Sequence, residues 1–189
     1  MVQFQQKYRV ESARLPHWDY AGPGWYYVTI CTRDRLCHFG NVMDDRVDLS
    51  PIGRIVADEW RKTAEIRAAV ALDEWVLMPN HLHGILVIHA APTVETPRRG
   101  VSTVPPSTKG ETAQRAVSTA NSLGSIVGQF KGACTKRVFA AGLGDFAWQP
   151  RYYDHVIRNY NDLTRIREYI VANPLRWELD RDRPANLDM

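Results

Sequence analysis

Apolar residues in the first half of the chain occur in short runs that are typical of β-strands. Aromatic and β-branched residues dominate 25–32, directly after a Gly-Pro-Gly sequence. Two further apolar segments, 72–77 and 81–89, are separated only by Met-Pro-Asn, where proline interrupts strand pairing. Because this connection is so short, we expect the two strands to pair as an antiparallel hairpin.

Three other segments place their apolar residues at helical spacing. The first is 51–69, which begins with proline after Ser50, a residue suited to cap a helix N-terminus. The second is 123–138, which keeps the helical spacing over several turns. The third begins near Asn161 or Asp162 and ends before Pro174, because proline disfavours helical geometry in the residue that precedes it.

The remaining segments complete the expected organisation of the chain. Residues 91–120 are rich in Pro, Ser, Thr and Gly and include no aromatic residue, so we expect a flexible insertion there. A short extended piece is expected over 146–153. The resulting order is strand, helix, strand, strand, helix, short strand, helix. This order predicts a single α+β domain over 1–189, a ferredoxin-like sandwich with one antiparallel sheet and helices mainly on one face.

The composition adds few constraints to this picture. Apolar residues make up 44% of the 189-residue chain and charged residues 24%, which are ordinary globular proportions. The net charge of +3 permits nucleic-acid binding without indicating it. Three cysteines with no CxxC pair favour reduced thiols in a cytoplasmic protein over a disulfide scaffold. No apolar run is long enough to span a bilayer, so we expect no membrane partner.

Two histidines open the predicted strand at 81–89. His81 and His83 are two positions apart, so both side chains point to the same face, where one divalent metal can bridge them. An isolated HxH is more often a pair of polar residues on a solvated strand, but its position directly after a tight turn favours a ligand pair. A histidine pair names no particular metal. His89 lies about 20 Å further along the strand and cannot join the same site.

The last predicted helix carries Tyr169 and Asn173, which are four positions apart and therefore share a face. Tyrosine is a potential nucleophile and asparagine a potential oxygen ligand. From spacing alone, a packing role for Tyr169 beside Ile166 and Ile170 is favoured.

A scattered set of basic residues surrounds the second predicted helix and the extended piece after it. Phosphate contacts require such residues, but a solvated helix face has the same composition, and the pattern favours neither interpretation. The candidates for DNA contact are Lys131, Lys136, Arg137, Arg151 and Arg158.

Four blocks of the sequence, in the same order, resemble those of IS200-like transposases, which belong to the HUH (His-hydrophobic-His) superfamily of single-strand nucleases. The first block is WVLMPNHLHGILVI, which resembles the signature strand of that family. The later blocks resemble the subgroup close to REP-associated tyrosine transposases; they are SIVGQFKGACTKRV, WQPRYYDHVIRN and RIREYIVANPLRW. The resemblance covers about 24–177 and is interrupted by the expected insertion.

The resemblance implies a ferredoxin-like fold, single-stranded hairpin DNA as the substrate, and Mg²⁺ or Mn²⁺ as the cofactor. It implies that His81 and His83 are metal ligands and that Tyr169 is the nucleophile. A polar residue one turn after this tyrosine often supplies a further ligand; better-known members carry glutamine, and this chain carries Asn173, which has the shorter reach. The implied activity is that of a metal-dependent endonuclease and strand transferase that forms a 5′-phosphotyrosine intermediate and releases a 3′ hydroxyl.

Two other classes of function fit parts of the pattern. A ferredoxin-like module can bind nucleic acid without cutting it, but such a module would not need Tyr169 together with a histidine pair. A zinc hydrolase needs a third His, Cys or carboxylate at ligand spacing, and none is evident. The resemblance implies a cytoplasmic, nucleoid-associated protein, and the sequence leaves open whether it is a monomer or a homodimer.

Overall fold

A computed structural model describes residues 15, 17–90 and 122–179 of the chain. The insertion predicted at 91–120 lies outside these residues. None of the described helices has the length and the apolar character needed to cross a membrane. In chain order, the elements are β1 (Gly24–Cys31), η1 (Arg33–Arg35), β2 (Gly40–Met43), β3 (Arg46–Leu49), α1 (Pro51–Glu65), β4 (Val70–Leu77), β5 (His81–Ile88), α3 (Leu123–Ala140), β6 (Tyr153–Ile157), α4 (Tyr160–Ala172) and η2 (Pro174–Leu179).

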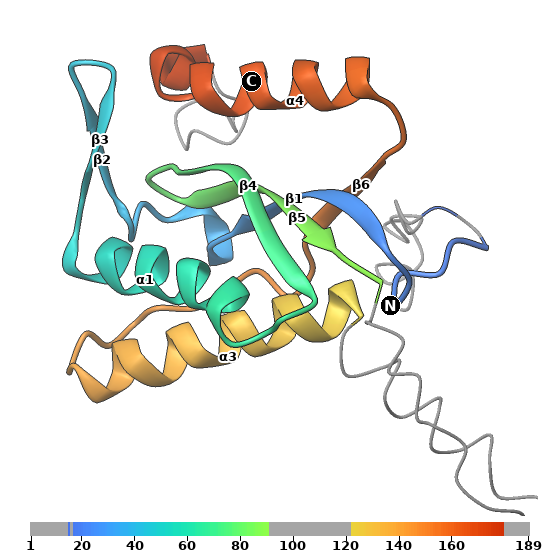
Figure 1. The fold of residues 1–189 in the computed structure, drawn as a ribbon. Helices are drawn as coiled ribbons and strands as arrows, with labels where there is room; N and C mark the ends of the chain where they lie inside the picture. Colours follow the sequence, from blue (N-terminus) through green and yellow to red (C-terminus); the bar gives the residue numbers. More distant parts are fainter. Residues whose placement is uncertain (1–14, 16, 91–121, 180–189) are drawn as a thin grey trace, which may run out of the picture.

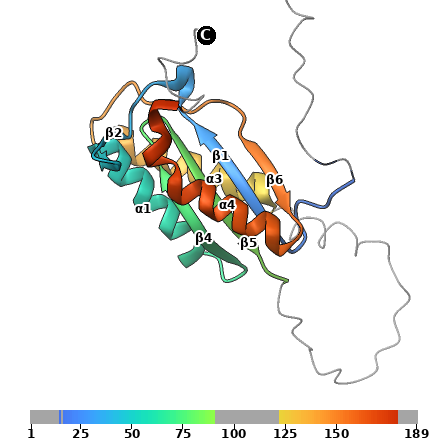
Figure 2. The same cartoon turned by 90° about the horizontal axis from the view of Figure 1, so that it is seen from above.

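Four of the strands form one antiparallel sheet in the order β4-β5-β1-β6. With α1 between β1 and β4 and α3 between β5 and β6, this is the arrangement of a ferredoxin-like sandwich, so the predicted α+β fold class is confirmed. Helices α1 and α3 cover one face of the sheet, whereas α4 lies across the other face (Figures 1 and 2). The helix that carries Tyr169 is therefore separated from the main helical layer by the sheet.

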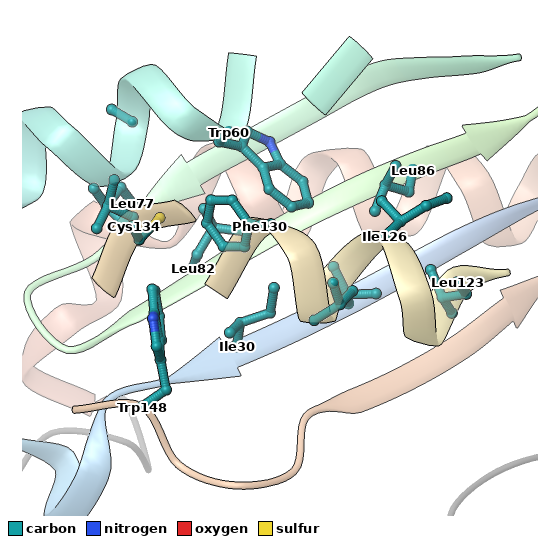
Figure 3. Packing of buried hydrophobic residues seen from close by; sticks show 14 of the residues in the cluster. Ile30, Trp60, Leu77, Leu82, Leu86, Leu123, Ile126, Phe130, Cys134 and Trp148 are labelled. Atoms are coloured by element: carbon teal, nitrogen blue, oxygen red, sulfur yellow. The ribbon is translucent and has the colours of Figure 1, made fainter. Parts of the chain in front are cut away.

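The main core lies between the sheet and the helices α1 and α3. The rings of Trp60 and Phe130 have centroids 5.1 Å apart and pack with Leu82 and Leu86 of β5 (Figure 3). A smaller apolar cluster packs α4 on the other face; its buried members are Tyr27, Ile85, Ile157, Ile166 and Ile170. Because side chains alternate along a strand, β5 supplies residues to both layers, and all eight of its residues are buried.

The antiparallel hairpin of β4 and β5 and the start of α1 agree with the sequence patterns. The Ser50 hydroxyl accepts a hydrogen bond from a backbone N–H of the first turn of α1 at 3.0 Å, as its capping role predicted. The helix ends at Glu65 and not near Ala69. It stops earlier because the chain turns there, with the N–H of Val70 donating to the carbonyl of Arg67, and then enters β4.

The edge strand next to β1 begins later than the sequence indicated. Within the extended piece predicted at 146–153, Trp148 forms only an isolated bridge with Thr32, and a continuous strand begins at Tyr153. Pro150 has no N–H to donate to a strand ladder, which explains why pairing does not extend through the earlier segment. The prediction of a strand over 146–153 was therefore wrong in its position.

A second hairpin, formed by β2 and β3, had no counterpart in the predicted elements. Its two-residue turn consists of Asp44 and Asp45, with φ angles of 48° and 60°. Aspartate tolerates this left-handed region better than most residues, and such turns match the twist of paired strands. The hairpin extends away from the main sheet (Figure 1).

Gly84 lies in the middle of β5, on the face against which Trp60 packs. A Cβ atom at this position would lie 2.6 Å from Cζ2 of Trp60 and 3.3 Å from Cβ of Trp75. Any larger residue would therefore push Trp60 away from the strand that carries both histidines.

We predict that Gly84→Ala destabilises the protein by about 1–3 kcal/mol, because the added methyl group overpacks a filled core. Urea unfolding measures this change. Gly128→Ala is the matched control: a Cβ there has no neighbour within 4 Å, and the helical position should gain about 0.5–1 kcal/mol. Equal midpoints for Gly84→Ala and the wild type would contradict the close packing of Trp60.

Candidate active site

The two histidines lie together on the α4 side of β5. His81 is fully buried and His83 is 2% exposed, and their ring centroids are 4.3 Å apart. The next residue with the same orientation, Ile85, belongs to the apolar cluster beneath α4. The imidazoles therefore share one face of the strand, as their spacing indicated, but this face is buried and not solvated.

The side chain of Asn80 determines which ring nitrogen of His81 carries a hydrogen. The Asn80 amide donates from Nδ2 to the carbonyl oxygen of Arg35 at 2.8 Å, which orients the amide. Its Oδ1 atom then lies 2.8 Å from Nδ1 of His81. Because an amide oxygen can only accept, Nδ1 of His81 carries the hydrogen, and in the neutral ring the lone pair lies on Nε2.

Groups from β1 and from α4 contact the two ring nitrogens of His83. The Tyr27 hydroxyl lies 2.8 Å from Nδ1, and the Thr29 hydroxyl lies 2.9 Å from the same atom. Thr29 is also the partner of His83 in the register between β1 and β5. The Tyr169 hydroxyl lies 3.4 Å from Nε2. The structure therefore brings the predicted nucleophile to the predicted histidine pair from a distant part of the chain.

Along the chain, Asn173 lies midway between two aromatic residues whose rings are near the histidines. Four residues before it, Tyr169 contacts His83, and four residues after it, the ring of Trp177 lies 6.1 Å from that of His81. Asn173 is 4% exposed, and its Oδ1 atom is buried with no hydrogen-bond partner among the described residues. A buried amide oxygen without a partner is costly, so its presence at this point needs a reason.

The atoms that could hold a metal here are one nitrogen of each imidazole and the amide oxygen. Within the described residues, no group of three His, Cys, Asp or Glu residues could hold a metal ion. A site built on His81 and His83 therefore needs a donor of another type, and Oδ1 of Asn173 is such a donor. In chemical terms, the residues present fit a divalent cation that accepts nitrogen and oxygen ligands.

Polar contacts hold α4 against the sheet at two places. Arg167 donates two hydrogen bonds to the carboxylate of Asp73 on β4, at 2.7 and 2.6 Å. The Arg167 guanidinium lowers the pKa of the Asp73 carboxyl group. At the first turn of α4, Nε2 of His155 lies 2.7 Å from the carboxylate of Asp162, and this hydrogen bond lowers the pKa of Asp162.

The basic residues predicted to contact DNA do not form one patch in the described structure. Lys131 donates to the carbonyl of Gln149 at 2.7 Å, and burial lowers its pKa. Arg137 pairs with Asp58 and Glu59 of α1. These residues and the exposed Lys136 lie on α3, across the sheet from Tyr169, whereas Arg151 and Arg158 are exposed at the two ends of β6.

Several residues that surround the histidines were not predicted from the sequence. Tyr27, Thr29 and Asn80 contact the rings, and Tyr153 on β6 is 44% exposed with its ring 6.2 Å from that of Tyr27. Asn80 precedes His81 directly and could have been considered from the sequence. The β1 residues are more than fifty positions away, and only the strand register reveals them.

The structure thus defines a ferredoxin-like domain in which a tyrosine on a helix faces a buried pair of histidines. No family model matches the chain. The chain is 34% identical over 170 residues to an uncharacterized protein of Haemophilus influenzae, and the match covers 90% of this chain and 91% of that protein. The chain therefore belongs to the same family as the Haemophilus protein.

Similar folds occur among solved structures. A REP-associated tyrosine transposase bound to a REP hairpin has a TM-score of 0.52 and 20% identity, over 84% of this chain and 70% of that chain. A putative transposase from Deinococcus radiodurans R1 has a TM-score of 0.41 and 17% identity, over 83% of this chain and 95% of that chain. The first of these two structures confirms the resemblance to REP-associated tyrosine transposases at the level of the fold.

We predict that Asp73→Asn weakens the docking of α4 and lowers the thermal midpoint at about pH 7. The folded-state pKa of Asp73 lies below its unfolded value of about 3.9, so its stabilising contribution is present above that value and is lost as the pH falls. The difference from the wild type should therefore shrink in acid. Glu74→Gln, which removes the neighbouring exposed carboxylate, is the control. A difference in thermal midpoint between Asp73→Asn and the wild type that stayed constant down to acid pH would count against the ion pair of Asp73 with Arg167.

Proposed function

We propose that the protein is an enzyme of the tyrosine transposase type, which cleaves and rejoins single-stranded DNA through Tyr169. One observation carries the proposal: Tyr169, a residue of α4 that is 40% exposed, has its hydroxyl 3.4 Å from Nε2 of the buried His83. The relative with the same fold was solved bound to a REP hairpin, which supports hairpin DNA as the substrate class. A homodimer stays a prediction.

The chemistry follows from the nucleophile. The oxygen of Tyr169 attacks the scissile phosphorus, and the bond from phosphorus to the 3′ oxygen breaks. The hydroxyl proton of Tyr169 passes to solvent, and the departing 3′ oxygen takes up a proton to become a 3′ hydroxyl. The 5′ phosphate stays bound to tyrosine, so a later attack by a 3′ hydroxyl can rejoin the strand and release Tyr169.

His81, His83 and Asn173 are the residues that would hold Mg²⁺ or Mn²⁺. The support is the orientation of His81, whose Nδ1 is committed to Asn80, and the buried Oδ1 of Asn173. The bound cation would neutralise charge on the phosphoryl oxygens as the phosphate is attacked. The chain's own part is to present these donors beside Tyr169, where the ring of Trp177 from η2 lies 6.1 Å from that of His81.

We predict that His81→Ala and His83→Ala each abolish Mn²⁺-dependent cleavage of hairpin DNA. Most DNA affinity should persist, because phosphate contacts by Lys and Arg dominate binding. Nicking of a labelled hairpin at limiting Mn²⁺, with a chelator control, measures the loss. His89→Ala is the matched variant, since His89 follows β5 and is exposed. Full nicking by either active-site variant would refute the metal assignment.

We predict that Tyr169→Phe binds the hairpin normally but forms no covalent adduct and releases no 3′ hydroxyl. The substitution removes one oxygen and little volume, so the fold should survive. A denaturing gel detects the adduct. Tyr160→Phe, at the exposed start of α4, should form it at the wild-type level. An adduct that persists in Tyr169→Phe and disappears in Tyr153→Phe would place the nucleophile on β6. A protein that binds hairpins and never forms an adduct would be a binding module.

A further inference from the structure

Tyr153 is an exposed aromatic residue in the same row of the sheet as the buried His83. Thr29 of β1 pairs with Tyr153 on one side and with His83 on the other, so the three side chains point to the α4 face. Along this row the exposed fraction rises from 2% at His83 and 5% at Thr29 to 44% at Tyr153. Two strand spacings separate Tyr153 from His83, which is about 10 Å. The row therefore leads from a buried imidazole to a partly exposed ring at the edge of the sheet.

Contacts with Tyr27 place the Tyr153 ring near the proposed nucleophile. The centroid of the Tyr27 ring lies 6.2 Å from that of Tyr153 and 6.4 Å from that of Tyr169. The rings of Tyr153 and Tyr169 are therefore at most about 13 Å apart. Tyr27 meets Tyr153 at an interplanar angle of 69°, so it does not cover the ring as a parallel neighbour would. A planar aromatic surface is thus exposed close to Tyr169.

Hydrogen bonds hold the backbone that leads into Tyr153. The Lys131 ammonium donates to the carbonyl of Gln149 at 2.7 Å and to that of Arg151 at 3.2 Å. The N–H of Gln149 donates to the carbonyl of Cys31, at the end of β1, at 2.9 Å. A tyrosine side chain has few rotatable bonds, so a ring on a fixed backbone loses little conformational entropy when it binds a ligand. The local structure therefore holds the ring in place before any ligand binds.

A planar ring in this position has the chemistry to bind a nucleic-acid base. Unpaired bases stack on exposed aromatic side chains, and such stacks tolerate any sequence because every base has a π face. Sites for single strands combine these rings with basic groups that follow the phosphate backbone. Exposed arginines lie at both ends of β6, Arg151 before Tyr153 and Arg158 after it. We propose that Tyr153 is a binding residue, whose ring stacks against an unpaired base of the strand that Tyr169 cleaves.

Two roles for the exposed Tyr153 ring make different predictions. Aromatic residues also occur on edge strands because they favour β structure, and a ring that only stabilises the strand affects the fold and every contact to DNA. A ring that stacks affects only the part of the affinity that the bases supply. Leucine at this position removes the planar ring and keeps an apolar side chain, whereas phenylalanine keeps the ring. The location of the base beside the cleaved phosphate rests on the proposed function, whereas the stacking itself does not.

The first test compares the affinities for a thymidine oligonucleotide and for an abasic strand of the same length, with a chelator present so that no strand is cut. The two strands carry the same phosphate charge and differ only in their bases. We expect Tyr153→Leu to bind the thymidine strand about 5- to 100-fold more weakly and the abasic strand as the wild type does. Tyr153→Phe should keep the wild-type ratio. Tyr160→Leu, which changes a 74% exposed tyrosine at the other end of α4, is the matched control and should also keep it. An unchanged ratio in Tyr153→Leu, or an equal loss for both strands, would overturn the inference.

The second test measures the rate of adduct formation with Mn²⁺ on a hairpin oligonucleotide that has single-stranded flanks. Tyr153→Leu should react more slowly than the wild type at limiting DNA and at the wild-type rate at saturating DNA, because the ring contributes to binding and not to the chemical step. A rate that stayed low at saturating DNA would overturn the binding role. If the wild type forms no adduct but Tyr153→Leu loses affinity for the thymidine strand alone, the proposed function fails while the stacking site stands.

Discussion

Strand β5 is buried on both of its faces, and it carries two histidines. All eight of its residues lie away from solvent, with Leu82 and Leu86 in the core beneath α1 and α3. On the other face, His81 and His83 point the same way as Ile85, which belongs to an apolar cluster. A buried imidazole must have its nitrogens satisfied or it destabilises the fold. This requirement explains why polar groups from β1 and from the turn before β5 converge on the two rings in an otherwise apolar layer.

The same burial determines how a nucleophile can reach the histidines. The sheet blocks access from the α1 and α3 side, so a reacting group has to come from the opposite face, where α4 lies (Figure 2). That helix is docked by a small apolar cluster, by an ion pair to β4 and by a hydrogen bond to β6. The result is a graded environment: the imidazoles are buried, whereas Tyr169 is 40% exposed. Tyr169 can therefore be reached from solvent, while the two imidazoles are held within the buried layer.

Local patterns predicted much of this arrangement, and the rest depends on contacts between distant segments. Helix periodicity and the Ser50 cap located α1, and the short Met-Pro-Asn turn predicted the hairpin that presents His81. The sequence could not show that α4 crosses the second face, because periodicity identifies an apolar stripe but not the surface that covers it. It also could not show that Lys131 and Arg137 bind groups of the protein itself, because these partners lie on other elements. The pairing of Thr29 with His83 is a matter of strand register alone.

The difference between a ligand pair and two solvated histidines lies in the groups that hold the rings, and not in the HxH spacing. Alternation places both imidazoles on one face in either case. On a solvated strand each ring can rotate and exchange tautomers, so its nitrogens face no fixed direction. Here the Asn80 amide oxygen can only accept, which requires a hydrogen on Nδ1 of His81 and directs the Nε2 lone pair of that ring away from Asn80. The hydroxyls of Tyr27 and Thr29 both lie at hydrogen-bond distance from Nδ1 of His83, whose Nε2 faces the Tyr169 hydroxyl. Three neighbouring polar side chains thus hold two histidine rings whose surroundings the HxH spacing alone does not determine.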